Sequence, residues 1–276
     1  MSVAGGQASA LAMGRLRAVL QAIGWGGLAI MATIAALSDF LARAPADTQG
    51  VGASLESPSP AMPFGTDDLG RDILGESVHA LSVTAQHALL AAVITIALGS
   101  FAGFAAARTP KAFGIVLRWA VGLFASVPGL LLAILLVGLS TKDFAAIAAG
   151  LGASPIAFVR AYDRTRREDF SAHARYARAT GISPASLLRR DLTYEFRNNF
   201  LQSAARAIAA VTIMLSTASF LGFGATPPHR DLGLMIAAAR PNYLAAWWTA
   251  AFPALALILL ILFARLAAGL EEGERP

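Results

Sequence analysis

Residues 63–74 read PFGTDDLGRDIL and place three carboxylates and one arginine in a short polar stretch of an otherwise apolar chain. Carboxylates at this density could bind a metal ion or act as general acids and bases. The regular D-x-D-x-D-G spacing of a calcium loop is missing, which argues against a lone metal site. As a structural alternative, Asp68 or Thr66 would cap a helix that begins near Leu69.

The remainder of the chain lacks the motifs of nucleotide-binding and hydrolytic sites. Neither lysine, Lys111 or Lys142, follows a glycine, so no P-loop is available to bind ATP. There is no G-x-S-x-G or H-E-x-x-H motif, the four histidines are scattered, and cysteine is absent. We therefore expect no catalytic residue, no metal site and no cofactor here, and a chain that is not an enzyme.

The elements that carry these residues are long apolar segments. Of the 276 residues, 56% are hydrophobic and 14% are charged, whereas a soluble chain carries about 25% charged residues. A membrane-spanning helix needs about 20 apolar residues. By this criterion we predict an all-α polytopic membrane protein, with lipid around six transmembrane helices at about 17–38, 84–107, 113–139, 143–162, 200–224 and 244–270.

The distribution of basic residues predicts the orientation. Of the 22 lysines and arginines, 17 lie on the side of the N-terminus and 5 on the other, which places both termini in the cytoplasm and 63–74 outside. A cleaved signal peptide over the first span is an alternative, although its apolar run is long for one. This one-sided charge also argues against nucleic acid as a partner. The predicted plan comprises a cytoplasmic segment 1–16, a transmembrane domain 17–270, external loops 39–83 and 225–243, a cytoplasmic loop 163–199 and a cytoplasmic tail 271–276.

The cytoplasmic loop has the pattern of two short helices around one break. Residues 166–180 are rich in Ala and Arg, and Gly181 then ends the helix. Ser183 is suited to cap a second helix with Pro184 in its first turn, and Leu187 begins its apolar face. We interpret the loop as a rigid surface that docks on a protein. The alternative is a basic loop that only fixes topology.

Three stretches resemble the permease subunits of bacterial ABC importers for dipeptides, oligopeptides and nickel, in particular the C-type member of the permease pair. FGTDDLGRDIL at 64–74 is similar to the family's external loop, and YARATG at 176–181 to its cytoplasmic EAA loop. SFLGFGATPP at 219–228 is similar to the segment where the fifth span leaves the membrane. The resemblance runs from about residue 12 to 272.

The resemblance implies an ABC importer type I permease fold in the bacterial inner membrane, with several partners. These are a second permease subunit in a heterodimer, two ATPase subunits that carry ATP and Mg, and an extracytoplasmic solute-binding protein. It assigns ATPase docking to Arg175, Tyr176, Ala177, Arg178, Gly181, Ser183, Leu187 and Arg190. It assigns external docking to Gly65, Thr66, Asp67, Asp68, Gly70, Arg71 and Asp72.

Within this reading, Pro128, Pro155 and Pro253 are candidate hinges, because proline removes a backbone donor and bends a helix. Thr212, Ser216 and Thr217 on the fifth span are candidates to line the pathway. The alternatives are static kinks and interhelical packing by small residues.

The chain departs from the family at several positions. Arg175 and Tyr176 stand where the EAA loop has Glu and Ala, Glu76 stands where the family has Arg, and Leu232 replaces an aromatic residue. In the family the EAA glutamate can pair with an arginine of the ATPase, which Arg175 could not do. Two alternatives therefore stay open, a decayed permease and a stand-alone channel or secondary carrier. The carrier would need coupling carboxylates that the spans lack.

Overall fold

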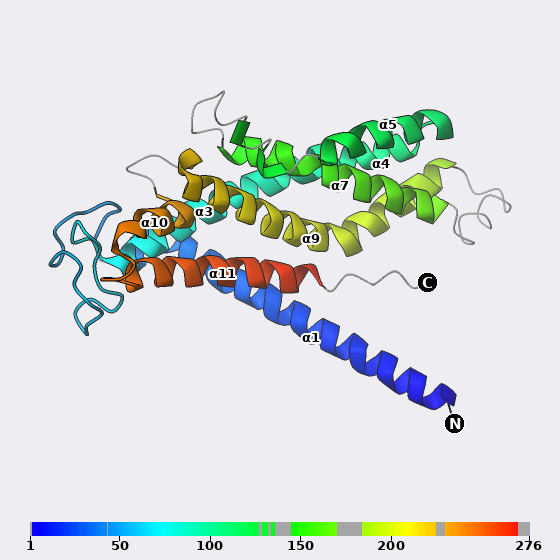
Figure 1. The fold of residues 1–276 in the computed structure, drawn as a ribbon. Coiled ribbons are helices and arrows are strands. Elements are labelled where there is room, and N and C mark those ends of the chain that lie inside the picture. The colour runs from blue at the N-terminus through cyan, green and yellow to red at the C-terminus, as the bar shows by residue number, and fades with distance from the viewer. Residues whose placement is uncertain are drawn as a thin grey trace. The chain divides into compact units, whose positions relative to one another are not determined.

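A computed structural model describes residues 2–42, 44–126, 129–131, 134–135, 145–169, 184–224 and 230–269, with the backbone alone at 2–12, 124, 145–146, 164, 167–169 and 184–199. These residues are mostly helical (Figure 1). Within the described ranges there is no β-strand, and Thr66 and Asp72 form an isolated antiparallel bridge. The chain divides into two compact units. Unit 1 is Met1–Ala85 with Thr226–Pro276, and unit 2 is Gln86–Ala225.

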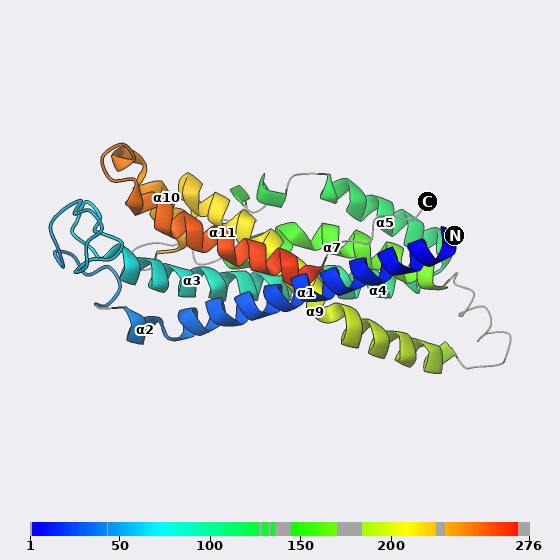
Figure 2. The ribbon, with the colours of Figure 1, turned by 90° about the horizontal axis from the view of Figure 1, so that it is seen from below.

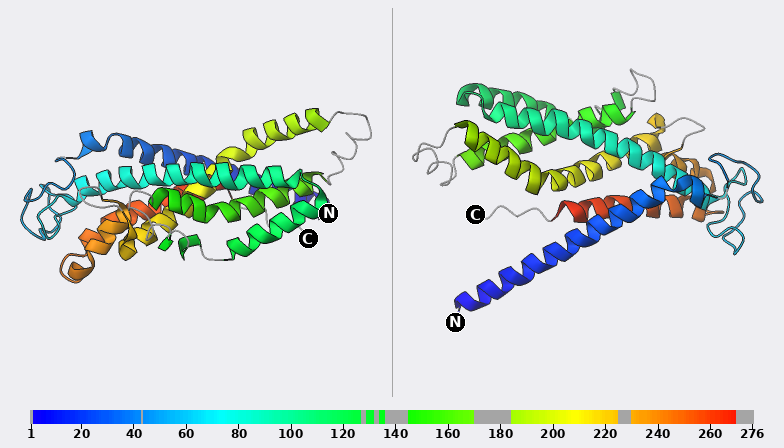
Figure 3. Two further views of the ribbon diagram at one scale, coloured as in Figure 1. Left: turned by 90° about the horizontal axis from the view of Figure 1, so that it is seen from above. Right: turned by 180° about the vertical axis from the view of Figure 1, so that it is seen from behind.

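Unit 1 is built around two long apolar helices, α1 (Ser2–Ala36) and α11 (Trp248–Ala268), which pack against each other. The N-terminal part of α1 continues past the end of α11 (Figures 1 and 3). The unit also holds the short elements α2 (Ser38–Leu41), α10 (Leu232–Ala238) and η4 (Arg240–Asn242), and the first turns of α3 (Ile73–Ile94). Asp231 caps α10 by accepting a hydrogen bond from the Leu234 amide at 2.9 Å, and Leu232 is fully buried in the core.

Glycines set the distance between α1 and α11. A Cβ atom added at Gly24 would overlap the backbone nitrogen of Ala267, and one added at Gly27 would overlap the ring of Phe263. Gly26 lies between them on the same helix and has no atom within 4 Å of such a Cβ. Small residues therefore let the two backbones approach, as is usual for helices that associate in lipid.

Unit 2 is organised around α7 (Ala145–Asp169), which packs on four neighbours: η1 (Thr95–Ser100), α4 (Phe101–Ala107), α5 (Lys111–Ala125) and α9 (Pro184–Ala218). Figure 2 shows α7 beside α4 and α5. One core cluster holds nine buried residues, of which seven are alanine. The remaining elements are the end of α3, the π-helix η1 (Thr95–Ser100) that joins it to α4, and the π-helix η3 (Ser219–Phe223) at the end of α9.

The π-helix η1 is explained by a competing hydrogen bond and a close contact. The Thr95 hydroxyl is within hydrogen-bond distance of two carbonyls, that of Ala91 at 2.8 Å and that of Gly150 on α7 at 3.2 Å. Side chains that bond to carbonyls in this way disturb the regular helical ladder. Gly99 in the same segment lies directly against the Ser154 carbonyl, so only a residue without Cβ fits there.

The all-α membrane fold expected from the sequence is confirmed. Among the described residues, four helical stretches are long and apolar enough to cross a membrane, and they match the predicted first, second, fifth and sixth spans: Met13–Ala36, Ile73–Ala107, Phe200–Phe223 and Trp248–Ala268. The predicted third and fourth spans, 113–139 and 143–162, fall partly outside the described residues. The count of six, the orientation of the termini and the domain boundaries stay predictions.

Two helices begin earlier than the predicted spans. The helix of the second span starts at Ile73 rather than at residue 84, because the acidic loop leads directly into it. The helix of the fifth span is described from Pro184 and continues through 35 residues. The second helix of the predicted docking loop and the fifth span therefore form one continuous helix. Pro155 and Pro253 lie inside helices that continue past them.

The contact between α1 and α11 predicts different outcomes at neighbouring glycines. Gly24→Ala should lower the thermal midpoint of the detergent-solubilised chain, because overpacking typically costs about 1–3 kcal/mol. Gly26→Ala is the matched control and should be neutral or stabilising, because alanine has the higher helix propensity by about 1 kcal/mol. Thermal unfolding followed by tryptophan fluorescence would test this. Equal midpoints for the two variants would contradict the packing described above.

Candidate functional site

The segment that leads from α2 to α3 folds back on itself at two glycines. Gly65 has φ of +71° and Gly70 has φ of +70°, a region in which residues with a Cβ are strained. Both sites are also crowded: a Cβ at Gly65 would lie 2.5 Å from the Glu56 carbonyl oxygen, and one at Gly70 would overlap the Gly52 carbonyl. The spacing of the two glycines therefore reflects the geometry of this turn.

Arg71 is the centre of a buried ionic group in this loop. Its side chain is 3% exposed and contacts Asp67 through Nε at 2.6 Å and Nη2 at 2.5 Å. Its Nη1 donates to Asp47 at 2.6 Å, and Arg230 approaches the same Asp47 oxygen at 3.5 Å. Burial lowers the pKa of Arg71, but the hydrogen bonds that it donates to Asp67 and Asp47, together with the negative charge of Asp67, outweigh this effect and raise the pKa overall, so the guanidinium stays charged.

The same ionic group is tied to α3 through Glu76. This carboxylate is buried in the first turn of α3 and accepts a hydrogen bond of 2.6 Å from the Asp47 amide. Here Glu76 replaces the arginine that the resembled family carries. The position therefore has a structural role in this chain, because it fixes the segment that supplies Asp47 to Arg71.

The prediction that Asp68 or Thr66 caps a helix near Leu69 is wrong. The helix begins at Ile73, and Asp72 caps it by accepting hydrogen bonds from the amides of Leu74 at 3.1 Å and Gly75 at 3.4 Å. Thr66 instead closes the loop, donating to the Ala53 carbonyl at 2.5 Å and accepting from the Glu56 amide at 2.9 Å. A cap must lie within a turn of the helix start, which excludes both predicted residues.

Most residues of the predicted external docking set point into the protein. Gly65, Thr66, Gly70, Arg71 and Asp72 are buried, and the Thr66 carbonyl accepts a hydrogen bond of 3.2 Å from the Trp248 indole on α11. Asp68 is the exception, since its side chain is 58% exposed, and Leu69 beside it is also exposed. The loop is therefore a rigid platform whose outward-facing tip is Asp68 and Leu69.

At one end of unit 2, two arginines connect α4, α5 and α7. Arg118 on α5 makes a two-point ion pair with Asp163 on α7, at 2.5 and 2.8 Å. Arg166 on α7 donates to the Thr109 carbonyl at 3.0 Å, immediately after α4, and lies 5.6 Å from the Tyr162 ring. We call these contacts the arginine clamp. Because α7 ends at Asp169, the clamp holds the helix that leads into residues 170–183.

Most of the predicted ATPase-docking residues lie outside the described residues: Arg175, Tyr176, Ala177, Arg178, Gly181 and Ser183. Leu187 and Arg190 are in the first turns of α9. Because α9 is described only from Pro184 onward, the place of this proline in the first turn stays a prediction. The first half of α9 diverges from α7 in Figures 2 and 3. The assignment of ATPase docking to these residues stays a prediction.

The candidate pathway residues on α9 differ in their surroundings. Thr212 is fully buried within unit 2, and its hydroxyl has no hydrogen-bond partner among the residues that the structure describes. Ser216 is also buried, whereas Thr217 is half-buried and donates to the Ile213 carbonyl at 2.7 Å. Of the candidate hinges, Pro253 is buried in α11, Pro155 is half-buried in α7, and Pro128 lies outside the described residues. Their roles in the pathway and as hinges stay predictions.

Sequence reasoning missed several residues that complete these two sites. Asp47 and Arg230 were not singled out, although both join the Arg71 group, and Asp163 and Arg166 were read only as part of a basic loop. Arg118, within the predicted third span, pairs with Asp163. The sequence holds a weak signal for Asp163, which is the one carboxylate among the five charged residues of 160–167.

The Arg71 group predicts a strong and residue-specific loss of stability. Arg71→Ala should destabilise the loop by about 3–5 kcal/mol, because it leaves two carboxylates without their buried partner. Asp68→Asn at the exposed tip is the control and should change stability by no more than about 0.5 kcal/mol. Limited proteolysis of the purified chain, with cleavage mapped to residues 44–72, would measure the opening. Equal protection of both variants would contradict the structural role of Arg71.

Comparison with known proteins identifies the family to which this chain belongs. Residues 95–271 match the family described as binding-protein-dependent transport system inner membrane component. The chain is 30% identical to the peptide transport system permease protein SapC of Haemophilus influenzae, over 83% of this chain and 80% of that protein. It is 26% identical to the dipeptide transport system permease protein DppC of the same organism, over 90% and 87% of the two chains. Identity to the oligopeptide transport system permease protein OppC of Mycobacterium bovis is 29%, over 81% and 79%.

The family match covers more than half of the chain, from the start of η1 to the apolar helix α11. The chain belongs to the family of inner membrane components of binding-protein-dependent transport systems, and it is a multi-pass permease subunit of the bacterial inner membrane.

Proposed function

We propose that this chain is one of two permease subunits of an ABC importer for peptides or peptide-like solutes. Two ATPase subunits, which bind ATP and Mg, dock on the cytoplasmic loop 163–199. A solute-binding protein delivers the solute to the outer face, where Asp68 and Leu69 form part of its docking surface. The pathway lies between this chain and its partner permease and is open alternately to each side.

The observation that carries the proposal is the way the docking loop is joined to the membrane helices. On one side, the arginine clamp fixes the end of α7 to α4 and α5. On the other, α9 runs unbroken from Pro184 into the apolar stretch Phe200–Phe223. A helix rises about 1.5 Å per residue, so α9 measures about 50 Å along its axis. A displacement of residues 170–183 would therefore move α7 and α9 as rigid elements.

The solute class rests on the relatives. Those reported above are named as permeases for dipeptides, oligopeptides or peptides. Nickel, which the resemblance also allowed, has no support from these names. The pathway residues of this chain would contact a solute that the binding protein has already selected.

Family membership does not favour the stand-alone channel or secondary carrier. Such a protein would also need ion-coupling carboxylates within the membrane. Among the described residues, the helix-end carboxylate Asp163 is already paired with Arg118. A decayed permease would keep the fold but lose the response to ATPase subunits, and the first experiment below separates that case from an active importer.

The first experiment is to express the chain with an affinity tag from its native operon and to identify co-purifying proteins by mass spectrometry. An active importer should bring a second multi-span permease and P-loop ATPases, and its ATPase activity should be lost on Gly181→Pro, because proline cannot adopt the positive φ of a helix-ending glycine. Gly122→Pro would not be a fair control, since it breaks α5. Gly181→Asn, which tolerates positive φ, should keep most of the activity. A chain that is recovered alone would overturn the proposal.

The arginine clamp predicts a charge-swap result. Each partner is about one third exposed, 34% for Arg118 and 33% for Asp163, so Asp163→Ala should cost no more than about 1 kcal/mol of stability. Its effect should appear as ATP hydrolysis uncoupled from uptake, since α7 is no longer fixed to α5. The double variant Arg118→Asp/Asp163→Arg should restore coupling in proteoliposomes. A double variant that is as uncoupled as either single change would show that the pair does not transmit movement.

A further inference from the structure

Unit 1 carries an exposed apolar surface on the turn that precedes α11. Tyr243, Leu244 and Trp247 are all exposed there, Leu244 completely and Trp247 to 60%. Figure 2 shows the turn between α10 and the beginning of α11. The proposed docking of a solute-binding protein uses Asp68 and Leu69 and leaves these side chains unexplained. Single exposed apolar residues are common, but three within five positions indicate a contact surface.

The length and charge of α11 fix the depth of this turn in the membrane. The 21 residues of α11 rise about 1.5 Å each and measure about 31 Å, which matches the hydrocarbon core of a bilayer, about 30 Å thick. No charged residue occurs from 241 to 264, between Arg240 and Arg265. A helix that just spans the hydrocarbon core begins at its boundary. Trp247, the residue before α11, therefore lies at the boundary, where Trp and Tyr side chains are enriched.

The exposed face of α11 continues the surface of the turn along the helix. Its large exposed side chains are Leu255, Ile258 and Leu262. They recur at spacings of three and four residues, in phase with Trp247 and Ala251 at the start of the helix, so they share one side of it. The turn is thus the end of a continuous apolar stripe on a helix that is long and apolar enough to cross the membrane.

The size of the side chains favours lipid over another helix as the neighbour of this stripe. The closest contacts between α1 and α11 are made at Gly24 and Gly27, and Ala264 and Ala267 are completely buried on α11. Small residues of this kind let helix backbones approach each other in a membrane. The exposed stripe has leucine, isoleucine and tryptophan instead. Its character is that of a surface against acyl chains.

We propose that Tyr243, Leu244 and Trp247 form a membrane anchor, which binds the headgroup region of the lipid leaflet next to the external loop. Leu244 enters the acyl chains and the Trp247 ring lies at their boundary with the headgroups. The distribution of basic residues predicts that this is the outer leaflet. The inference depends on membrane location alone and not on the transported solute.

The membrane anchor is joined to the external loop by the residues that follow it. The Trp248 indole donates to the Thr66 carbonyl at 3.2 Å. The ring of Phe252 stacks on Phe64, with centroids 3.9 Å apart. The depth at which the anchor binds therefore sets the height of the loop, and of its exposed tip, above the membrane.

The test uses the absence of cysteine from this chain, because one introduced cysteine then carries one nitroxide label. Leu244→Cys, Asp68→Cys and Ile258→Cys are each co-expressed from the native operon and reconstituted in vesicles of phosphatidylethanolamine and phosphatidylglycerol. Electron paramagnetic resonance measures collisions of each label with oxygen, which concentrates in lipid, and with a water-soluble nickel complex. The unsubstituted chain gives the background from cysteines of co-purified subunits. The ratio of oxygen to nickel collisions should rise from position 68 to 244 and again to 258.

Two results at position 244 would overturn the proposal. Nickel collisions as frequent as at position 68 would place the turn in water. Protection from both reagents would show that a protein subunit covers the surface. Because Leu244 is completely exposed, its substitution should not disturb folding. The measurement can also be made on a chain that is recovered alone, so its outcome is independent of the proposed function.

The role of Trp247 has its own variants. Trp247→Ser in the chain labelled at position 244 should raise the nickel collisions, because the ring that lies at the boundary is lost. Trp247→Phe keeps a ring and should hold the label near its original depth. Equal nickel collisions in these two variants would contradict an anchor role for Trp247.

Discussion

Close contact between helix backbones is the constraint on which both units depend. Helices in lipid gain little hydrophobic free energy from one another, so they are held by van der Waals contact and hydrogen bonds. In unit 1 the contact is made at Gly24 and Gly27 against α11. In unit 2, seven alanines fill a nine-residue core cluster, and Gly99 and Gly103 lie directly on the α7 backbone. The high glycine and alanine content therefore follows from helix packing in a membrane.

The ion pairs of Arg71 and of Arg118 differ in how deeply they are buried. In the loop between α2 and α3, Arg71 is almost fully buried, and such a charge is tolerable only because Asp67 and Asp47 both bind it. The loop can therefore hold Asp68 outward on a fixed frame. The Arg118–Asp163 pair is partly exposed and contributes little to stability. Its geometry matters more, because a two-point ion pair fixes the orientation of two helices.

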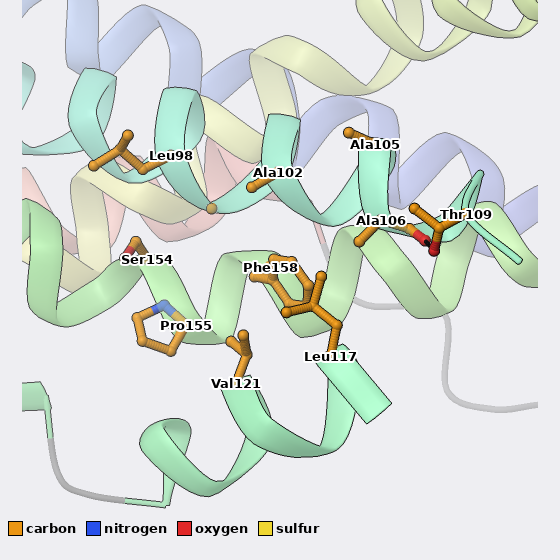
Figure 4. Close-up of a pocket in the computed structure, with 11 residues that line it drawn as sticks. Leu98, Ala102, Ala105, Ala106, Thr109, Leu117, Val121, Ser154, Pro155 and Phe158 are labelled. Atoms are coloured by element: carbon orange, nitrogen blue, oxygen red, sulfur yellow. Dashed lines mark hydrogen bonds between the residues drawn. The ribbon is translucent and has the colours of Figure 1, made fainter. Parts of the chain in front are cut away.

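The arginine clamp connects three elements, α4, α5 and α7. Arg166 and Arg118 hold these elements together at their basic side, and an apolar groove of about 600 Å³ lies between them (Figure 4). The proposed coupling depends on these helices moving together when the docking loop moves.

The sequence by itself determined the apolar helices, the absence of a P-loop and, through the resemblance, the family. These are local properties, because apolar length, helix-breaking residues and motif spacing can be read within one segment. Only the tertiary structure decided that Asp72 caps α3, that Arg71 is buried, and that Thr212 lies inside unit 2. It also joined Arg71 to Asp47 across 24 positions and Arg118 to Asp163 across 45. Side chains so far apart in the chain meet only through helix packing, and no local pattern in the sequence specifies which pairs will meet.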